Sequence, residues 1–219
     1  MHNDRADEYL GELRDFCLRQ GFPEEQFLSR DNLDRFVETA VDAYSDYPLH
    51  LHLFEGAVDT GLLTRMMVID MRSRLDKTVG LCTGDCESVM LVEAPMTKKT
   101  GVLQYIREID IHSLRLLIRQ ETLREEHFES YALKKRKPYM DDRTWYIYIF
   151  ATKRAFQRQG HGKKLMHLMR SFADAHDYHI CLETNKEANV AMYEAFGFQL
   201  METTVYHHSV DHYVLRYGA

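Results

Sequence analysis

The chain has 219 residues, of which 45% are hydrophobic and 28% are charged, and its formal net charge is −6 with histidine counted as neutral. This composition is typical of a globular protein and excludes a disordered chain. The length suits one large domain or two small ones. The acidic balance argues against a general nucleic-acid binder, because such proteins normally carry a basic field.

No segment resembles a membrane span or a secretory signal. The longest clean apolar run is 145–151, much shorter than the roughly 20 residues that a bilayer requires. The first eight residues are polar and acidic, unlike a signal peptide. We therefore predict a cytoplasmic protein that binds neither membrane nor nucleic acid.

The four cysteines are Cys17, Cys82, Cys86 and Cys181. Cys82 and Cys86 flank a turn and would form a disulfide only in an oxidising compartment. Their spacing is not that of a zinc knuckle, and no second ligand pair completes a site. We therefore expect no metal.

The first 138 residues are predicted to be mostly helical. Apolar residues recur at helical spacing over 7–20 and 32–44. Residues 61–75 are predicted to be helical from composition, although their apolar spacing is irregular, and further helices are expected at 101–109 and 111–133. The alternating segment 49–54 fits either a short strand or part of a loop and helix. Residues 79–82 and 88–94 predict an antiparallel hairpin around a turn. The basic segment 134–138 is interpreted as a solvated loop.

The last third of the chain alternates strands and helices more regularly. Residues 145–150 are aromatic or β-branched and predict a buried strand. A loop and an amphipathic helix follow it. The remaining elements are strand 179–183, a short helix at 187–196 closed by Gly197, and strands near 199–205 and 210–217. We predict one domain over 1–219, with residues 1–28 as an N-terminal helical addition.

The segment between strand 145–150 and the following helix has the features of a phosphate-binding loop. It contains two glycines, Gly160 and Gly162, directly at the predicted helix start. Helix N-termini carry unpaired N–H donors and a partial positive charge, and glycine lets an anion approach the backbone closely. Basic residues raise the local charge to +5 between Lys153 and Lys164, which leaves −11 for the rest of the chain (−6 minus +5).

Two common phosphate motifs do not fit this loop. A Walker A loop requires glycine at the position of Gln157 and serine or threonine at the position of Lys164. A dinucleotide fingerprint that begins at Gly160 requires a small residue where Leu165 stands. Both motifs are therefore rejected.

The loop instead resembles the pyrophosphate loop of the GNAT superfamily of acyl-CoA N-acyltransferases, Gln/Arg-x-x-Gly-x-Gly/Ala. The order of its flanking strands is also similar, and Asn189, Tyr193 and Gly197-Phe198 resemble the family's Asn-x-x-x-Tyr-x-x-x-Gly-Phe signature. The likeness covers about residues 145–200. Residues 182–185 are similar to a branch that includes puromycin acetyltransferase-like enzymes.

This resemblance implies an α/β (α+β) fold with a mixed, mostly antiparallel central sheet, flanking helices and a splay between the two central strands. It implies acetyl-CoA as co-substrate and an acetyl-CoA-binding core at 145–200. The backbone of Ala151 and Thr152 would pair with the pantetheine arm, and Asn189 would bind on the same side. The pyrophosphate would be held by the loop residues, which are Gln157, Arg158, Gln159, Gly160, His161, Gly162 and Lys163.

The resemblance also implies catalytic roles. Tyr193 would protonate the departing thiolate as general acid, whereas the alternative is a packed aromatic residue. Glu183 is our first choice for general base, with a structural hydrogen-bonding glutamate as the equal alternative. His50 and His52 lie in the region of the acceptor pocket but fit structural roles better. His207, His208 and His212 fit a hydrated turn better than a catalytic role.

The function predicted from the sequence is an acetyl-CoA-dependent N-acetyltransferase that acts directly on a primary amine of a small molecule. The alternatives are an acetylase of protein N-termini or lysines and a non-catalytic acyl-CoA-binding module. The partner is expected to be a small amine, for which the acidic remainder of the chain offers electrostatic attraction. The protein is expected to be a monomer or a homodimer.

Overall fold

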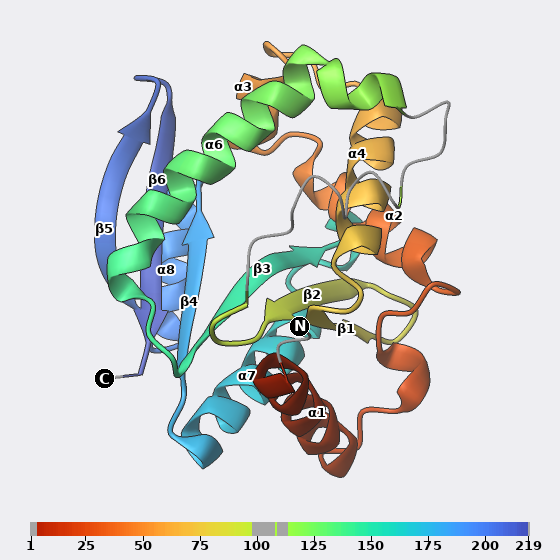
Figure 1. Cartoon of the computed structure of the whole chain (residues 1–219), viewed down its shortest axis with the longest axis vertical. Helices are drawn as coiled ribbons and strands as arrows, with labels where there is room; N and C mark the ends of the chain where they lie inside the picture. Colours follow the sequence, from red (N-terminus) through yellow and green to blue (C-terminus); the bar gives the residue numbers. More distant parts are fainter. Residues whose placement is uncertain (1–3, 98–107, 109–113, 219) are drawn as a thin grey trace.

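A computed structural model of the protein describes residues 4–97, 108 and 114–218. Within these residues, six strands form one sheet in the order β1-β2-β3-β4-β6-β5 (Figure 1). The β3/β4 pair is parallel and every other neighbouring pair is antiparallel. The strands are β1 (Thr78–Thr83), β2 (Ser88–Glu93), β3 (Thr144–Thr152), β4 (His179–Thr184), β5 (Gln199–Tyr206) and β6 (Val210–Tyr217). The predicted mixed, mostly antiparallel sheet is confirmed.

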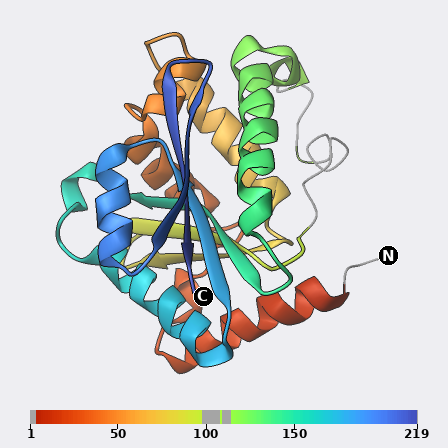
Figure 2. The same ribbon diagram turned by 90° about the vertical axis from the view of Figure 1, so that its left-hand side faces the viewer.

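Helices cover both faces of the sheet. Helices α1 and α7 pack on one face of β1–β3, and α2 and α4 pack on the other (Figure 1). Helices α8 and α6 lie on opposite sides of β5 and β6 (Figure 2). The helix bounds are α1 (Asp4–Arg19), α2 (Leu33–Tyr44), α3 (Pro48–Leu53), α4 (Thr60–Ser73), α6 (Gln120–Arg136), α7 (His161–His176) and α8 (Glu187–Ala195).

Most predicted elements match these helices and strands, with two exceptions. Segment 49–54 is mostly helix α3, which begins with Pro48 in its first turn, where a missing N–H costs nothing. The prediction of a solvated loop at 134–138 is wrong, because α6 continues to Arg136 and that side chain is buried. Most of predicted helix 101–109 and the start of predicted helix 111–133 lie outside the described residues.

All four cysteines are free and buried, so Cys82 and Cys86 form no disulfide. In the described part of the chain, no helix has both the length and the apolar character needed to cross a membrane.

The splay between the central strands is present. Pairing between β3 and β4 runs from Thr144↔His179 to Ile147↔Leu182 and stops there. At the same point the pairing of β3 with β2 contains a β-bulge. Ile147 and Ile149 pair with the consecutive β2 residues Val92 and Leu91, so Tyr148 between them is an extra, bulged residue. A bulge bends its strand. Beyond Tyr148, β3 therefore follows β2 while β4 follows β6, and the two strands separate.

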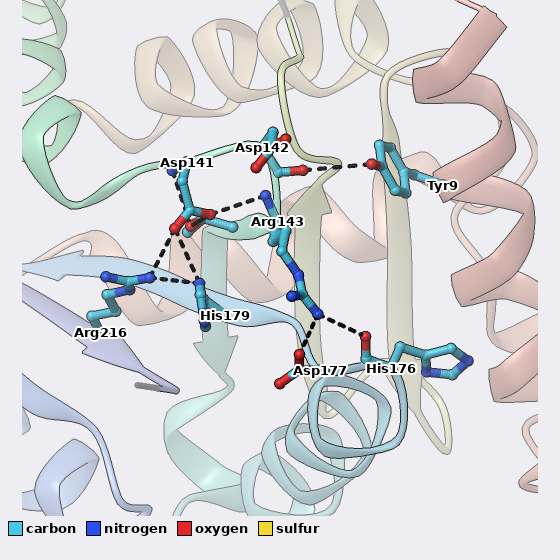
Figure 3. Close-up of polar contacts among 9 residues, drawn as sticks. Tyr9, Asp141, Asp142, Arg143, His176, Asp177, His179 and Arg216 are labelled. Carbon is cyan, nitrogen blue, oxygen red and sulfur yellow. Dashed lines mark hydrogen bonds and ion pairs between the residues drawn. The ribbon is translucent and has the colours of Figure 1, made fainter.

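The other end of this strand pair is held closed by a cluster of polar contacts centred on Asp141 (Figure 3). Its carboxylate accepts hydrogen bonds from the Thr144 hydroxyl at 2.6 Å and from Arg216 at 2.9 Å, and it lies 3.2 Å from His179 Nδ1. These partners belong to β3, β6 and β4 respectively. The cluster thus fastens β3 to β4 and β6 at one end, while β3 and β4 diverge at the other.

The core beneath the sheet fixes helix α7, whose first turn holds the last residues of the predicted phosphate loop. Phe172 of α7 is fully buried, and its ring centroid lies 5.2 Å from that of Trp145 and 5.3 Å from that of Phe16. These contacts join α7 to β3 and α1.

We expect Phe172→Ala to lower the free energy of unfolding by about 3–5 kcal/mol, because it removes buried apolar surface and leaves a cavity. Denaturant unfolding measures the change. Phe156→Ala is the matched control, since Phe156 is 37% exposed, and its effect is expected to be below about 1 kcal/mol. Equal losses in the two variants would contradict this description of the core.

Candidate active site

A cavity of about 550 Å³ lies where β3 and β4 diverge. It brings together nearly all of the residues that the sequence singled out. Those that line it are Ala151, Thr152, Gln157, Arg158, Gly160, His161, Gly162, Lys163, Glu183, Asn189 and Tyr193. Gln159 is not among the lining residues, and its side-chain amide donates a hydrogen bond to the Ala155 carbonyl at 2.9 Å.

The phosphate loop ends at Gly160, which is the N-cap of α7 and has φ = 91°. Glycine adopts this left-handed conformation without steric cost. The Gly160 carbonyl accepts from Lys164 N–H at 3.0 Å, while the first N–H groups of the helix have no capping side chain. Gly162 has a different role: a Cβ there would lie 3.1 Å from the Phe150 ring and 3.2 Å from Thr152 Oγ1. The helix start can therefore approach β3 closely.

The five basic residues of 153–164 do not all face an anion. Lys153 forms an ion pair with Glu38 at 3.2 Å, and Arg154 forms one with Asp46 at 3.1 Å. Helix α2 and the loop after it thus neutralise two of the five charges. Among the described residues, Arg158 and Lys163 have no ion pair, and both line the cavity.

The divergence leaves backbone groups of β3 exposed on the side of β4. The Tyr44 hydroxyl accepts from Phe150 N–H and donates to Phe150 C=O, both at 3.3 Å. The Thr152 carbonyl accepts from Gln157 Nε2 at 3.3 Å. Neighbouring strand residues point their backbone groups to opposite edges, and the Ala151 carbonyl accordingly accepts from Ser88 of β2 at 2.9 Å. The open edge toward β4 thus belongs to Phe150 and Thr152, while the Ala151 carbonyl faces β2.

Tyr193 is placed by the end of its helix. Gly197 N–H donates to Glu194 C=O at 2.8 Å, and Phe198 N–H donates to Tyr193 C=O at 3.1 Å. Gly197 has φ = 83°, so the chain forms a Schellman motif, as the sequence predicted for a glycine cap. The Phe198 ring packs 5.9 Å from that of Tyr193. The Gly-Phe pair of the signature thus orients Tyr193.

The phenol of Tyr193 is chemically suited to donate a proton. Its side chain is 5% exposed and lines the cavity, and its hydroxyl has no hydrogen-bond partner among the described residues. Burial, with smaller contributions from Tyr47 and Tyr44, raises the pKa of Tyr193 well above its ordinary value of 10. The hydroxyl is therefore protonated at neutral pH.

Asn189 belongs to a network at the end of β4. Its side-chain amide donates to Thr184 Oγ1 at 3.0 Å, and the same oxygen lies 2.7 Å from the Tyr47 hydroxyl. The Asn185 N–H donates to that hydroxyl at 2.8 Å. One side of Asn189 thus connects α8 to β4, while the residue as a whole lines the cavity.

Glu183 is held by three donors or potential donors from three elements. Its Oε2 accepts from Tyr146 at 2.6 Å and from Arg136 at 2.9 Å, and its Oε1 lies 3.1 Å from His212 Nε2. Burial alone would raise the pKa of Glu183, but Arg136, His212 and Tyr146 outweigh burial and hold the pKa below its ordinary value. These contacts fit the alternative role of Glu183, a structural glutamate that holds neighbouring elements by hydrogen bonds, better than the role of general base.

The histidines fall into different environments. His212 is 1% exposed, which contradicts its assignment to a hydrated turn. His207 and His208 do form the exposed turn between β5 and β6, both with positive φ. His50 is buried and stacks on Tyr44, and burial lowers the pKa of His50 to about 4. His52 lies 3.1 Å from the Ser209 hydroxyl.

Local sequence patterns did not indicate three residues that shape the cavity or its surroundings: Tyr44, Tyr47 and Arg136. Tyr44 reads as the last apolar position of a helix, and Arg136 as one charge in a basic run. The hydrogen bonds that join them to β3 and β4 span between 47 and 138 positions along the chain, so no local pattern reveals them. Within the described residues, no group of three or more histidine, cysteine or acidic side chains is arranged to hold a metal.

Comparison with known proteins agrees with this geometry. Residues 130–200 match the family described as Acetyltransferase (GNAT) domain. These residues contain the phosphate loop, α8 and Tyr193. A search of curated proteins found no match.

Solved structures with the same fold share little sequence with this chain. The histone acetyltransferase HPA2 and related acetyltransferase from Corynebacterium glutamicum ATCC 13032 is 15% identical, with a TM-score of 0.57, and the match covers 87% of this chain and 94% of that one. Arylalkylamine N-acetyltransferase 2 from Aedes aegypti is 14% identical, with a TM-score of 0.54 and coverage of 88% and 97%. The C-terminal condensation domain of Ebony, in complex with β-alanyl-dopamine, is 10% identical, with a TM-score of 0.58 and coverage of 88% and 97%.

The splayed sheet and the glycine-capped helix start are those of the GNAT fold, and residues 130–200 match the GNAT acetyltransferase domain. Members of this family generally use acetyl-CoA. The domain match over residues 130–200 supports an N-acetyltransferase in general terms.

The environment of Glu183 predicts a pH-dependent loss of stability in Glu183→Gln. At neutral pH we expect a loss of about 3 kcal/mol, because Arg136 is left buried without its main partner. A carboxylate whose pKa is depressed by folding stabilises the protein above its unfolded pKa, and this contribution disappears as the pH falls through the folded value. The difference from the parent protein should therefore shrink below about pH 4.5.

Urea unfolding between pH 3.5 and pH 8 measures this difference. Glu194→Gln is the control, since Glu194 is exposed on the neighbouring helix α8, and it should follow the parent protein at each pH. A Glu183→Gln variant with unchanged stability at neutral pH would contradict the structural role.

Proposed function

We propose that this protein is an acetyl-CoA-dependent N-acetyltransferase that transfers an acetyl group directly to a primary amine of a small molecule. The observation that carries the proposal is the cavity between the diverging strands. It combines the open N-terminus of α7 with a buried, protonated Tyr193 hydroxyl. An anion site and a proton donor in one cavity are what transfer from a phosphate-bearing thioester requires.

The residues present fit acetyl-CoA along the length of the cavity. The N–H groups at the start of α7, with Arg158 and Lys163, supply donors and positive charge for the pyrophosphate. The edge of β3 at Phe150 and Thr152 has backbone groups bonded only to the side chains of Tyr44 and Gln157, and the amides of the pantetheine arm would replace these side chains. Asn189 lines the same cavity from α8.

In this proposal the amine nitrogen attacks the acetyl carbonyl, and the carbon–sulfur bond breaks. Tyr193 gives its proton to the leaving thiolate, because its phenol is protonated and its hydroxyl is free to donate. We assign Glu183 to holding β4, α6 and β6 in place, since its carboxylate already contacts Tyr146, Arg136 and His212. Proton removal from the amine is not assigned to Glu183.

The acceptor is proposed to be a small cationic amine. Outside 153–164 the chain carries a net charge of −11, which attracts cations rather than anions. Among the structural relatives, the Aedes aegypti protein is named an arylalkylamine N-acetyltransferase, and the Ebony domain was solved in complex with β-alanyl-dopamine. The Corynebacterium glutamicum protein is instead named a histone acetyltransferase. Acetylation of protein N-termini or lysines is therefore the enzymatic alternative. Cytoplasmic location and a single domain stay predictions.

An assay of acetyl-CoA-dependent thiol release tests the proposal directly. The panel should contain arylalkylamines, polyamines, aminoglycosides and peptides with free N-termini or lysines. We expect turnover with at least one small amine. Turnover with peptides alone would favour the protein acetylase, and binding of acetyl-CoA without turnover of any amine would favour a non-catalytic module.

Tyr193→Phe is expected to lower kcat by about 100-fold, because it removes the proton donor while it preserves the ring packing on Phe198. The variant should bind acetyl-CoA with nearly unchanged affinity. Steady-state kinetics with the best amine measures both effects. Tyr217→Phe is a matched control, because its hydroxyl binds Asp174 at 2.7 Å outside the cavity. Unchanged kcat in Tyr193→Phe would overturn the general-acid assignment.

A further inference from the structure

Two tyrosines at the end of α2 reach the two diverging strands separately. Tyr44 is the last residue of α2, and Tyr47 follows three positions later, before α3 begins at Pro48. Their rings lie 5.4 Å apart, and both line the cavity. The Tyr44 hydroxyl binds β3, whereas the Tyr47 hydroxyl binds the end of β4.

The Tyr44 contact replaces a missing strand neighbour. A single hydroxyl accepts from Phe150 N–H and donates to Phe150 C=O, each at 3.3 Å. This pair of groups points toward the gap, where β4 would have continued to bond it if the strands had stayed together. Burial raises the pKa of Tyr44 above its ordinary value. The phenol therefore keeps the proton that it donates to the carbonyl.

The Tyr47 contact is shorter and holds a different part of the site. Its hydroxyl lies 2.7 Å from Thr184 Oγ1 and accepts from Asn185 N–H at 2.8 Å. Thr184 in turn accepts from Asn189 Nδ2. Tyr47 thus fixes the end of β4 and, through Thr184, one side of Asn189.

From these contacts we propose that Tyr44 and Tyr47 are positioning residues with opposite effects on cofactor affinity, an inference that rests on the proposed function. Tyr47 holds the β4 side of the cavity in its binding geometry. Tyr44 occupies the backbone groups of Phe150 that an amide of the pantetheine arm would use, so the hydroxyl and the amide compete for the same donor and acceptor. Binding of acetyl-CoA at this edge requires the Tyr44 hydroxyl to leave Phe150.

The competition gives Tyr44→Phe an unusual expected result: the variant should bind CoA more tightly than the parent protein. Loss of one net hydrogen bond from the competing state corresponds to a gain of about 3–10-fold in affinity. Tyr47→Phe should instead bind CoA more weakly, because Thr184 and Asn189 lose a fixed partner. If Tyr44 merely supported the fold, Tyr44→Phe would bind CoA more weakly than the parent protein.

Isothermal titration calorimetry with CoA and with acetyl-CoA measures these affinities on the full chain, and the KM for acetyl-CoA should change in the same directions. Tyr178→Phe is the matched control, since its hydroxyl binds Glu12 at 2.7 Å, away from the cavity. Its affinity should equal that of the parent protein. Amide hydrogen exchange at Phe150 gives a second readout, in which exchange is faster in Tyr44→Phe than in the parent protein and CoA slows it again.

The outcomes separate this inference from the proposed function. If the parent protein binds neither CoA nor acetyl-CoA, the proposed function fails and this inference fails with it. If the parent protein binds CoA but Tyr44→Phe binds it equally or more weakly, only the competition at Phe150 is overturned. Tighter binding in both tyrosine variants would also overturn it, because the effect would not be specific to the edge of β3. If amide exchange at Phe150 is no faster in Tyr44→Phe than in the parent protein, the competition is contradicted as well.

Discussion

The separation of β3 and β4 is the constraint on which the rest of the site depends. Unpaired backbone groups inside a protein are costly unless they find partners. The bulge at Tyr148 ends the pairing after Ile147, and the freed edge is then partly satisfied by side chains from elsewhere, Tyr44 and Gln157. The same separation creates the cavity in which the anion site of α7 and the Tyr193 hydroxyl meet.

A buried charge network holds the other side of the separated strands. Arg136 reaches from α6 to Glu183 on β4, and Glu183 also meets Tyr146 on β3 and His212 on β6. The Arg136 guanidinium lies 4.3 Å from the Tyr146 ring centroid. Removing Arg136 or Glu183 leaves the other charge buried without its main partner. The network therefore keeps the sheet and α6 in one arrangement around the inner end of the cavity.

The segments of the proposed site whose residues are close in the chain have local sequence signals. The loop around Gly160 and the run from Asn189 to Phe198 are local, because their geometry comes from helix capping within a few residues. Two other features have no local signal. Arg136 was read from its basic neighbours, whereas its burial decides its role, and the register of the sheet turns the Ala151 carbonyl toward β2. Neither property is visible in the residues themselves.

By itself, the sequence determined the order of the elements, the glycines at both helix termini of the site, and the tyrosine that we propose as proton donor. Only the tertiary structure decided which side chains occupy the open edge of β3, which groups surround the Glu183 carboxylate, and which basic residues face the cavity. The physical reason is distance along the chain. Tyr44 meets Phe150 across 106 positions, and Lys153 meets Glu38 across more than 100. Such partners follow from how the layers pack, and no local pattern encodes that packing.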